Sequence, residues 1–241
     1  MKKVSQIRNA SIWIFILPVA VINLCLFISV NHHLFEDTIF VVDQIGRSAF
    51  TIPYIDGGVS ISRTARTFPT YLLFKPGMIL TAILLIKYWV INNSLIKTIN
   101  NENNKNKYFL IFGVMSAIFL IIHSIFLGVQ FEYDLYKLFR RFILLSFIVF
   151  EIVAQTLLVI TLFKIKDKIS NMINKNILIL KIILVSLLIV VAIVCLPIVT
   201  SSGNTSFKHA LEWNYFIGVI SFYLLTFLFW KGSRKTQVHT P

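Results

Sequence analysis

The chain has 241 residues, of which 57% are hydrophobic and only 14% are charged. A soluble domain is usually about half apolar and about a quarter charged, so this composition excludes an ordinary soluble domain and indicates a protein that folds in lipid. The net charge of +13 does not indicate a nucleic-acid partner, because the Lys and Arg residues stand in short clusters between apolar segments. Both cysteines, Cys25 and Cys195, lie inside apolar segments, so we expect no disulfide framework, no metal site and no cofactor.

Six apolar segments are long enough to cross a bilayer as helices, which takes about 20 mostly apolar residues. The first follows a basic stretch, but it is long for a signal peptide and no cleavage site follows it, so we expect it to be retained. The predicted spans are 11–30, 69–91, 108–130, 141–163, 177–200 and 210–230. Since each is continuously apolar, the predicted fold is an all-α polytopic transmembrane helix bundle, one domain over 1–241, and not a β-barrel.

The loops between the spans differ in charge. Lys and Arg gather in the amino-terminal tail, in the loops after the second and fourth spans and in the carboxyl-terminal tail, whereas the long loop 31–68 carries four acidic residues. The positive-inside rule therefore predicts that both termini are cytoplasmic and that 31–68 is an outer loop. We expect a multi-pass protein of a bacterial inner membrane or a eukaryotic endomembrane.

Ionisable side chains inside spans are costly, so they are candidates for a functional site. Glu151 lies near the middle of the fourth span, and Gln155 follows four residues later on the same helix face. His123 lies nearer the outer end of the third span, in line with Ser116 and Gln130. An alternative for the Glu151–Gln155 pair is interhelical hydrogen bonding that only holds the bundle together, and His123 is equally open to a structural or a functional role.

Other polar residues lie near the span ends. Those near the outer ends are Lys75, His209, Glu212 and Trp213, the last three expected in the first turn of the sixth span. Lys87 and Lys181 lie near the inner ends, where we expect them to reach the interface. The outer set, with His123 and Glu151, predicts a cavity open to the outer leaflet, at the depth of a lipid headgroup or ester.

The end of the outer loop combines hydroxyl groups with arginines. Ser62 and Thr64 stand beside Arg63 and Arg66, a combination that can hold a phosphate by bidentate and single hydrogen bonds. The alternative is an ordinary polar loop with arginines at the headgroup level.

Two short motifs resemble the Frag1/DRAM/Sfk1 family of six-span membrane proteins, which includes GPI-anchor remodelling factors and the amino-terminal domain of Cwh43-type proteins. The outer loop contains ISRTA at 61–65, followed by Pro69 and Phe74, and the last span begins with Glu212 and Trp213. The resemblance implies a role in lipid remodelling or membrane trafficking. The positions it marks are Ile61, Ser62, Thr64, Pro69, Glu212 and Trp213.

The sequence departs from the family pattern at three positions. Arg63 stands where an acidic residue is common, Ala65 where glycine is common, and Thr70 where glutamate often follows the proline. The resemblance is therefore to a distant member of the family.

Three functions remain open from the sequence. The favoured one is a bundle that binds a membrane lipid, or a membrane-protein partner, in an outer-leaflet cavity. The second is a lipid-modifying acyltransferase or hydrolase, with His123 as base and Glu151 or Glu212 as its orienting carboxylate. The third is a transporter, which the lack of an internal repeat disfavours.

Overall fold

The computed structural model describes residues 2–100, 107–129, 134–201 and 203–231. Among these residues, six helices are long and apolar enough to cross a membrane, so the chain is a multi-pass integral membrane protein. They are α1 (Lys2–Val30), α3 (Tyr71–Asn100), α4 (Tyr108–Phe126), α5 (Asp134–Lys164), α6 (Lys175–Thr200) and α7 (Thr205–Phe229). The loop between α1 and α3 holds two 3₁₀ turns, His32–Phe35 and Gln44–Gly46, and the short helix α2 (Ile61–Ala65).

Most helices differ in length from the predicted spans. Helix α1 begins at Lys2 rather than at 11, α3 continues to Asn100 rather than ending at 91, and α5 begins at Asp134 rather than at 141. The backbone hydrogen bonds of a helix do not require apolar side chains, so a helix can continue past the apolar stretch that marks its span. Helix α4 ends at Phe126, before the 130 predicted, because Gly128 takes a left-handed conformation with φ of 83°.

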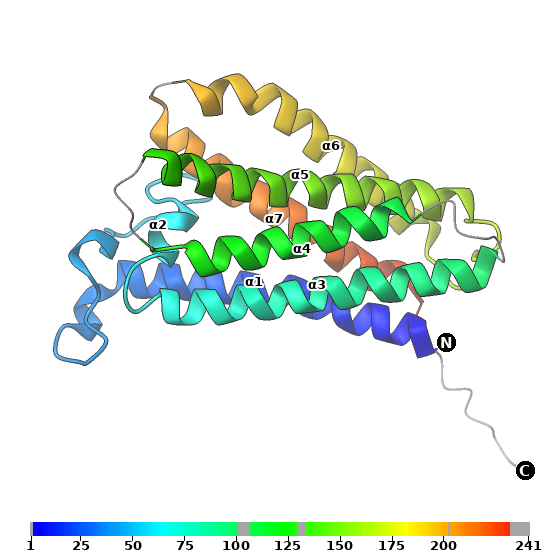
Figure 1. Ribbon diagram of the computed structural model, residues 1–241, viewed down its shortest axis with the longest axis horizontal. Helices are drawn as coiled ribbons and strands as arrows, with labels where there is room; N and C mark the ends of the chain where they lie inside the picture. The colour runs from blue at the N-terminus through cyan, green and yellow to red at the C-terminus, as the bar shows by residue number, and fades with distance from the viewer. Residues whose placement is uncertain (1, 101–106, 130–133, 202, 232–241) are drawn as a thin grey trace, which may run out of the picture.

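The helices form one antiparallel bundle (Figure 1), in which α1 packs against α3 and α7, and α4 packs between α3 and α5. Helix α1 begins, and α7 ends, at the same end of the bundle, as an even number of spans requires. Helix α6 lies along α5 and α7 near that end and leans away from both toward the opposite end (Figure 1). The bundle is therefore more open at the end that carries α2.

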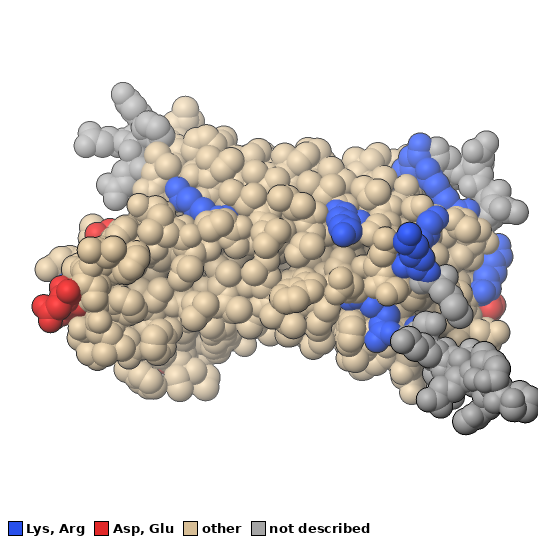
Figure 2. Space-filling model, turned by 90° about the horizontal axis from the view of Figure 1, so that it is seen from below, with Lys and Arg blue, Asp and Glu red and all other residues tan. Residues whose placement is uncertain are grey.

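Charged side chains on the face shown in Figure 2 lie mainly toward the two ends, with a largely uncharged band between them. Most of the basic side chains lie toward the end where α1 begins, and the acidic ones lie mainly at the opposite end. These are the inner and the outer end in the orientation predicted from the charges of the loops.

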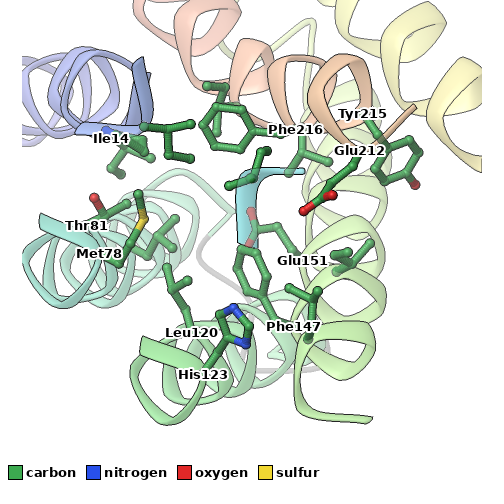
Figure 3. A pocket seen from close by; sticks show the side chains of 18 of the residues that line it. Ile14, Met78, Thr81, Leu120, His123, Phe147, Glu151, Glu212, Tyr215 and Phe216 are labelled. Carbon is green, nitrogen blue, oxygen red and sulfur yellow. The ribbon is translucent and has the colours of Figure 1, made fainter. Parts of the chain in front are cut away.

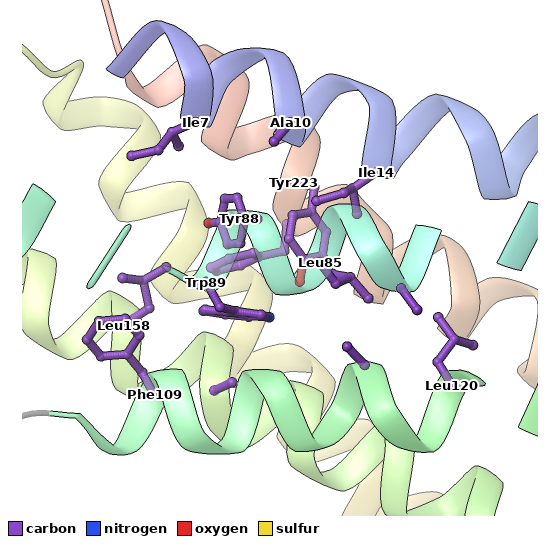
Figure 4. Packing of buried hydrophobic residues seen from close by; sticks show 14 of the residues in the cluster. Ile7, Ala10, Ile14, Leu85, Tyr88, Trp89, Phe109, Leu120, Leu158 and Tyr223 are labelled. Atoms are coloured by element: carbon purple, nitrogen blue, oxygen red, sulfur yellow. The ribbon is translucent and has the colours of Figure 1, made fainter. Parts of the chain in front are cut away.

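The inner half of the bundle is closely packed (Figure 4). Trp89, Phe109 and Tyr223 are almost fully buried, and the ring of Tyr88 meets those of Trp89 and Tyr223 edge to face, each with centroids 5.0 Å apart. The end of α7 is tied to the loop before α6, because Asn174 N donates to Phe229 O at 2.9 Å. Aromatic packing and backbone pairing thus close this end.

Candidate functional site

The outer loop is fastened to the side of α7. Trp213 Nε1 donates to Val59 O at 2.8 Å, and Asn214 Nδ2 donates to Tyr54 O at 2.7 Å. The rings of Tyr54 and Trp213 also meet edge to face, with centroids 4.9 Å apart. Trp213 is one of the residues that the family resemblance marks, and it is fully buried. Through these contacts it anchors the loop over the outer end of the bundle.

Glu212 and His209 strengthen the same attachment. The Glu212 carboxylate accepts hydrogen bonds from the backbone amides of Ile61 and Ser62, at the start of α2. These amides have no partner within a helix, and a negative charge is favourable there. His209 Nδ1 lies 3.0 Å from Gly57 O. Because α7 begins at Thr205, the prediction that His209 and Glu212 lie in its first turn was wrong.

A cavity of about 170 Å³ lies beneath α2, lined by side chains of α1, α2, α3, α4, α5 and α7 (Figure 3). Its wall is almost entirely apolar, with side chains such as Met78, Leu120 and Phe147. The polar side chains in the wall are Ser62, Thr81, His123, Glu151, Glu212, Tyr215 and Tyr223. The structure thus places three ionisable residues singled out from the sequence, His123, Glu151 and Glu212, around one hollow.

Glu151 is fully occupied by protein partners. Ser116 Oγ donates to Glu151 Oε2 at 2.6 Å, Gln155 Nε2 donates to Oε1 at 3.0 Å, and the Tyr223 hydroxyl also donates to Oε1. Gln155 Nε2 reaches Val219 O as well, at 3.2 Å. These bonds connect α4, α5 and α7, so they hold the bundle together in the manner of interhelical polar contacts in membranes.

His123 differs from Glu151. Within the described part of the chain, its ring has no hydrogen bond to Glu151, to Glu212 or to another side chain. Figure 3 shows the imidazole pointing from α4 toward the cavity. No described residue bonds to the ring nitrogens, so the imidazole can bond with a molecule in the cavity.

The hydroxyl and arginine side chains at 62–66 point to different places. Ser62 lines the cavity, whereas the buried Thr64 Oγ1 donates to Ile61 O at 2.8 Å. Arg63 Nε donates to Ile45 O at 3.3 Å on the loop surface, and Arg66 lines a separate groove with Lys75. The structure does not gather these side chains into one phosphate site. Gln130, expected in line with His123, lies outside the described residues.

Lys181 was missed as a buried residue, and the prediction that it reaches the interface was wrong. Its side chain is fully buried, and its Nζ donates to Thr226 Oγ1 at 2.8 Å. The ammonium also lies 4.0 Å from the ring centroid of Phe222 and 5.3 Å from that of Phe229. Since α6 is apolar on every side, its sequence gives no polar face from which the buried side could be identified.

Comparison with models of protein families, with curated proteins and with solved structures finds no match.

Proposed function

We propose that the protein is a lipid-binding membrane protein of the Frag1/DRAM/Sfk1 type that holds the apolar part of an outer-leaflet lipid in the cavity beneath α2. The observation that carries the proposal is the His123 imidazole, which bonds to no described residue, in the wall of a mainly apolar cavity. An apolar hollow favours an apolar occupant, and an unpaired imidazole favours an occupant with one polar group. A lipid chain with an ester or hydroxyl group has both features.

The size of the cavity fits part of a chain. An engineered apolar cavity of roughly 150 Å³ in another protein stays dry and binds a small hydrocarbon. The present cavity, at about 170 Å³, can therefore take several carbons of a lipid without rearrangement. The rest of the lipid would remain in the bilayer.

The proposed route from the bilayer passes between α5 and α7. The cavity wall includes Leu144 and Phe147 of α5 and Tyr215 and Phe216 of α7, and Tyr215 also donates to Leu188 O of α6 at 3.2 Å. Lipid chains surround this side of the bundle, so a chain can enter sideways without crossing the headgroup layer.

The family resemblance is supported by the way its motifs meet. Glu212 and Trp213 bond to the backbone of Ile61, Ser62 and Val59, so segments far apart in the sequence form one attachment between the loop and α7. Arg63 is one of the three positions that depart from the family pattern. Its side chain is exposed, so an arginine can stand there in place of an acidic residue without burying a charge. The implied role is in lipid remodelling or membrane trafficking, with both termini cytoplasmic.

A lipid-modifying enzyme is the alternative, and the geometry gives it less support. A histidine that acts as base is usually oriented by a carboxylate within hydrogen-bonding reach. Glu151 is occupied by Ser116, Gln155 and Tyr223, and Glu212 is occupied by the start of α2.

The test is native mass spectrometry with lipid extraction on protein solubilised in a mild neutral detergent. Ile148→Trp places an indole in the cavity, whereas Val149→Trp places it on the neighbouring surface of α5, where Val149 is 47% exposed and does not line the cavity. We expect a stoichiometric lipid on the wild type and on Val149→Trp, and its loss from Ile148→Trp. Equal lipid content in all three proteins, or none in the wild type, would contradict the proposal.

A further inference from the structure

A second hollow lies at the outer end of the molecule, apart from the apolar cavity. It is a groove of about 1060 Å³ between the outer loop and the beginning of α3 on one side, and the turn after α4 with the beginning of α5 on the other. Its charged lining residues are Arg66, Lys75, Arg140, Arg141 and Asp43. Four cations thus share this groove with one carboxylate.

The cations of the groove have no acidic partner among the described side chains. No salt bridge between those side chains involves any of the four, and Asp43 Oδ2 instead accepts a hydrogen bond from Phe68 N at 3.0 Å. Lys75 Nζ donates to Ile125 O at 3.3 Å and lies 5.4 Å from the ring centroid of Tyr71. Partial burial, followed by the nearby charges of Arg140 and Arg63, lowers the pKa of Arg66. Like charges held this close repel one another, and an anion between them would relieve the repulsion.

The position of this cluster makes it unusual. Positive residues normally gather on the cytoplasmic side of a membrane protein, where they set its orientation. The groove lies at the opposite end, so the positive-inside rule does not account for it. Arg141 is exposed, Arg66 and Arg140 are partly buried, and the Arg140 guanidinium lies 5.8 Å from the ring centroid of Tyr136.

The groove is also held in shape by its backbone. Gly128, which lines it, has φ of 83°, and a Cβ at this position would lie 2.6 Å from Arg66 O. The turn after α4 therefore packs directly against the backbone that carries Arg66. A site already formed before binding loses less entropy when its ligand arrives.

We propose that this groove binds a phosphate group at the outer membrane interface, held by Arg66, Arg140 and Arg141 with Lys75 as an additional charge. The planar guanidinium group matches phosphate oxygens in bidentate fashion, and several guanidinium groups can share one phosphate. Either a phospholipid headgroup of the outer leaflet or a soluble phosphate compound presents this chemistry. The inference does not depend on a lipid in the apolar cavity.

The test compares wild type, Arg66→Gln/Arg140→Gln and Arg47→Gln in a neutral detergent. Arg47 is a matched control on the same loop, paired with Glu36 at 3.5 Å and absent from the groove lining. Binding of dioleoylphosphatidylglycerol and of dioleoylglycerol, which has the same chains without the phosphate, is measured by native mass spectrometry. We expect the double variant to bind the phospholipid at least about tenfold more weakly, while wild type and Arg47→Gln bind it equally. Dioleoylglycerol should bind all three proteins alike.

Sodium phosphate, compared with sodium chloride at the same ionic strength, distinguishes the two sources. Phospholipid binding that persists in phosphate identifies a headgroup site, whereas binding that phosphate abolishes identifies a site for soluble phosphate compounds. The proposal is overturned if wild type does not prefer phosphatidylglycerol to dioleoylglycerol, or if the double variant binds like wild type.

Two further variants keep the result interpretable. If the double variant fails to fold, Arg141→Gln changes an exposed residue and should weaken phospholipid binding in the same direction; unchanged binding there would count against the site. The cavity variant Ile148→Trp should keep the phosphate preference, so failure of the groove and failure of the cavity can be told apart.

Discussion

The inner and outer halves of the bundle both bury polar side chains, but they bury them differently. In the inner half, Lys181 and Tyr88 both meet Thr226 and are surrounded by aromatic rings. In the outer half, His123 faces a mainly apolar hollow, and no described residue bonds to its ring. Burial of a polar side chain in a membrane is therefore a weak sign of function by itself, and unfilled space beside the side chain is the stronger one.

The difference arises from the placement of two segments. Helix α6 closes the bundle near the inner end and leans away toward the outer end (Figure 1), and the outer loop covers the outer parts of α1 and α7, where Glu212 and Trp213 hold it. Glu151 lies between the two halves. It lines the cavity, but its carboxylate accepts hydrogen bonds from protein side chains, as the polar residues of the inner half also bond to protein. Variants can show whether each of these residues stabilises the bundle or contributes to lipid binding.

The largest effect is expected at Glu151. Glu151→Leu leaves the donors of Ser116, Gln155 and Tyr223 without their acceptor, and we expect a loss of about 2 kcal/mol of stability, since each interhelical bond in a membrane contributes roughly 0.6–1.7 kcal/mol. Thermal unfolding in detergent measures this. Glu151→Gln retains an acceptor oxygen and should lose less, and an unchanged midpoint in Glu151→Leu would remove the packing role.

Lys181→Met should act in the opposite direction. Lys181 has no carboxylate partner among the described residues, and an apolar side chain of similar volume often replaces a buried charge without loss. We expect a gain of about 1–2 kcal/mol in unfolding stability, with unchanged lipid content. Lys181→Ala, which leaves a void, is the control and should be destabilised. A loss of bound lipid in Lys181→Met would instead assign the inner half a functional role.

Trp213→Phe tests the attachment of the outer loop. The substitution keeps an aromatic ring but removes the bond from Nε1 to Val59 O, and we expect a loss of about 1 kcal/mol. Limited proteolysis should cut the outer loop faster in this variant, while Trp13→Phe, at an exposed position on α1, should behave like wild type. Equal cleavage rates in both variants would show that the bond does not hold the loop.

The smallest effect on stability is expected at His123. Because its ring bonds to no other described side chain, His123→Leu should change the unfolding stability by less than about 0.5 kcal/mol. The same variant should nevertheless lose selectivity for lipids with a polar group at cavity depth, measured as the ratio of bound diacylglycerol to bound hydrocarbon. A marked loss of stability without a change in this ratio would make His123 a packing residue.

The sequence was sufficient for the features that depend on composition and spacing. It predicted six spans, and the four-residue spacing of Glu151 and Gln155 corresponds to a hydrogen bond in the structure. It could not predict the helical ends beyond the apolar stretches, the short helix α2 or the burial of Lys181. These features depend on which helix faces meet, and a helix that is apolar all round, such as α6, does not indicate its contacts.

Photocrosslinking tests most directly whether a lipid chain occupies the cavity beneath α2, as proposed. The protein is reconstituted with a phospholipid that carries a diazirine within its acyl chain, and the labelled residues are mapped by mass spectrometry. We predict labelling of cavity side chains such as Phe147 and Leu120, and its loss in Ile148→Trp but not in Val149→Trp. Labelling confined to outward-facing side chains such as Val149 and Val190 would contradict the claim.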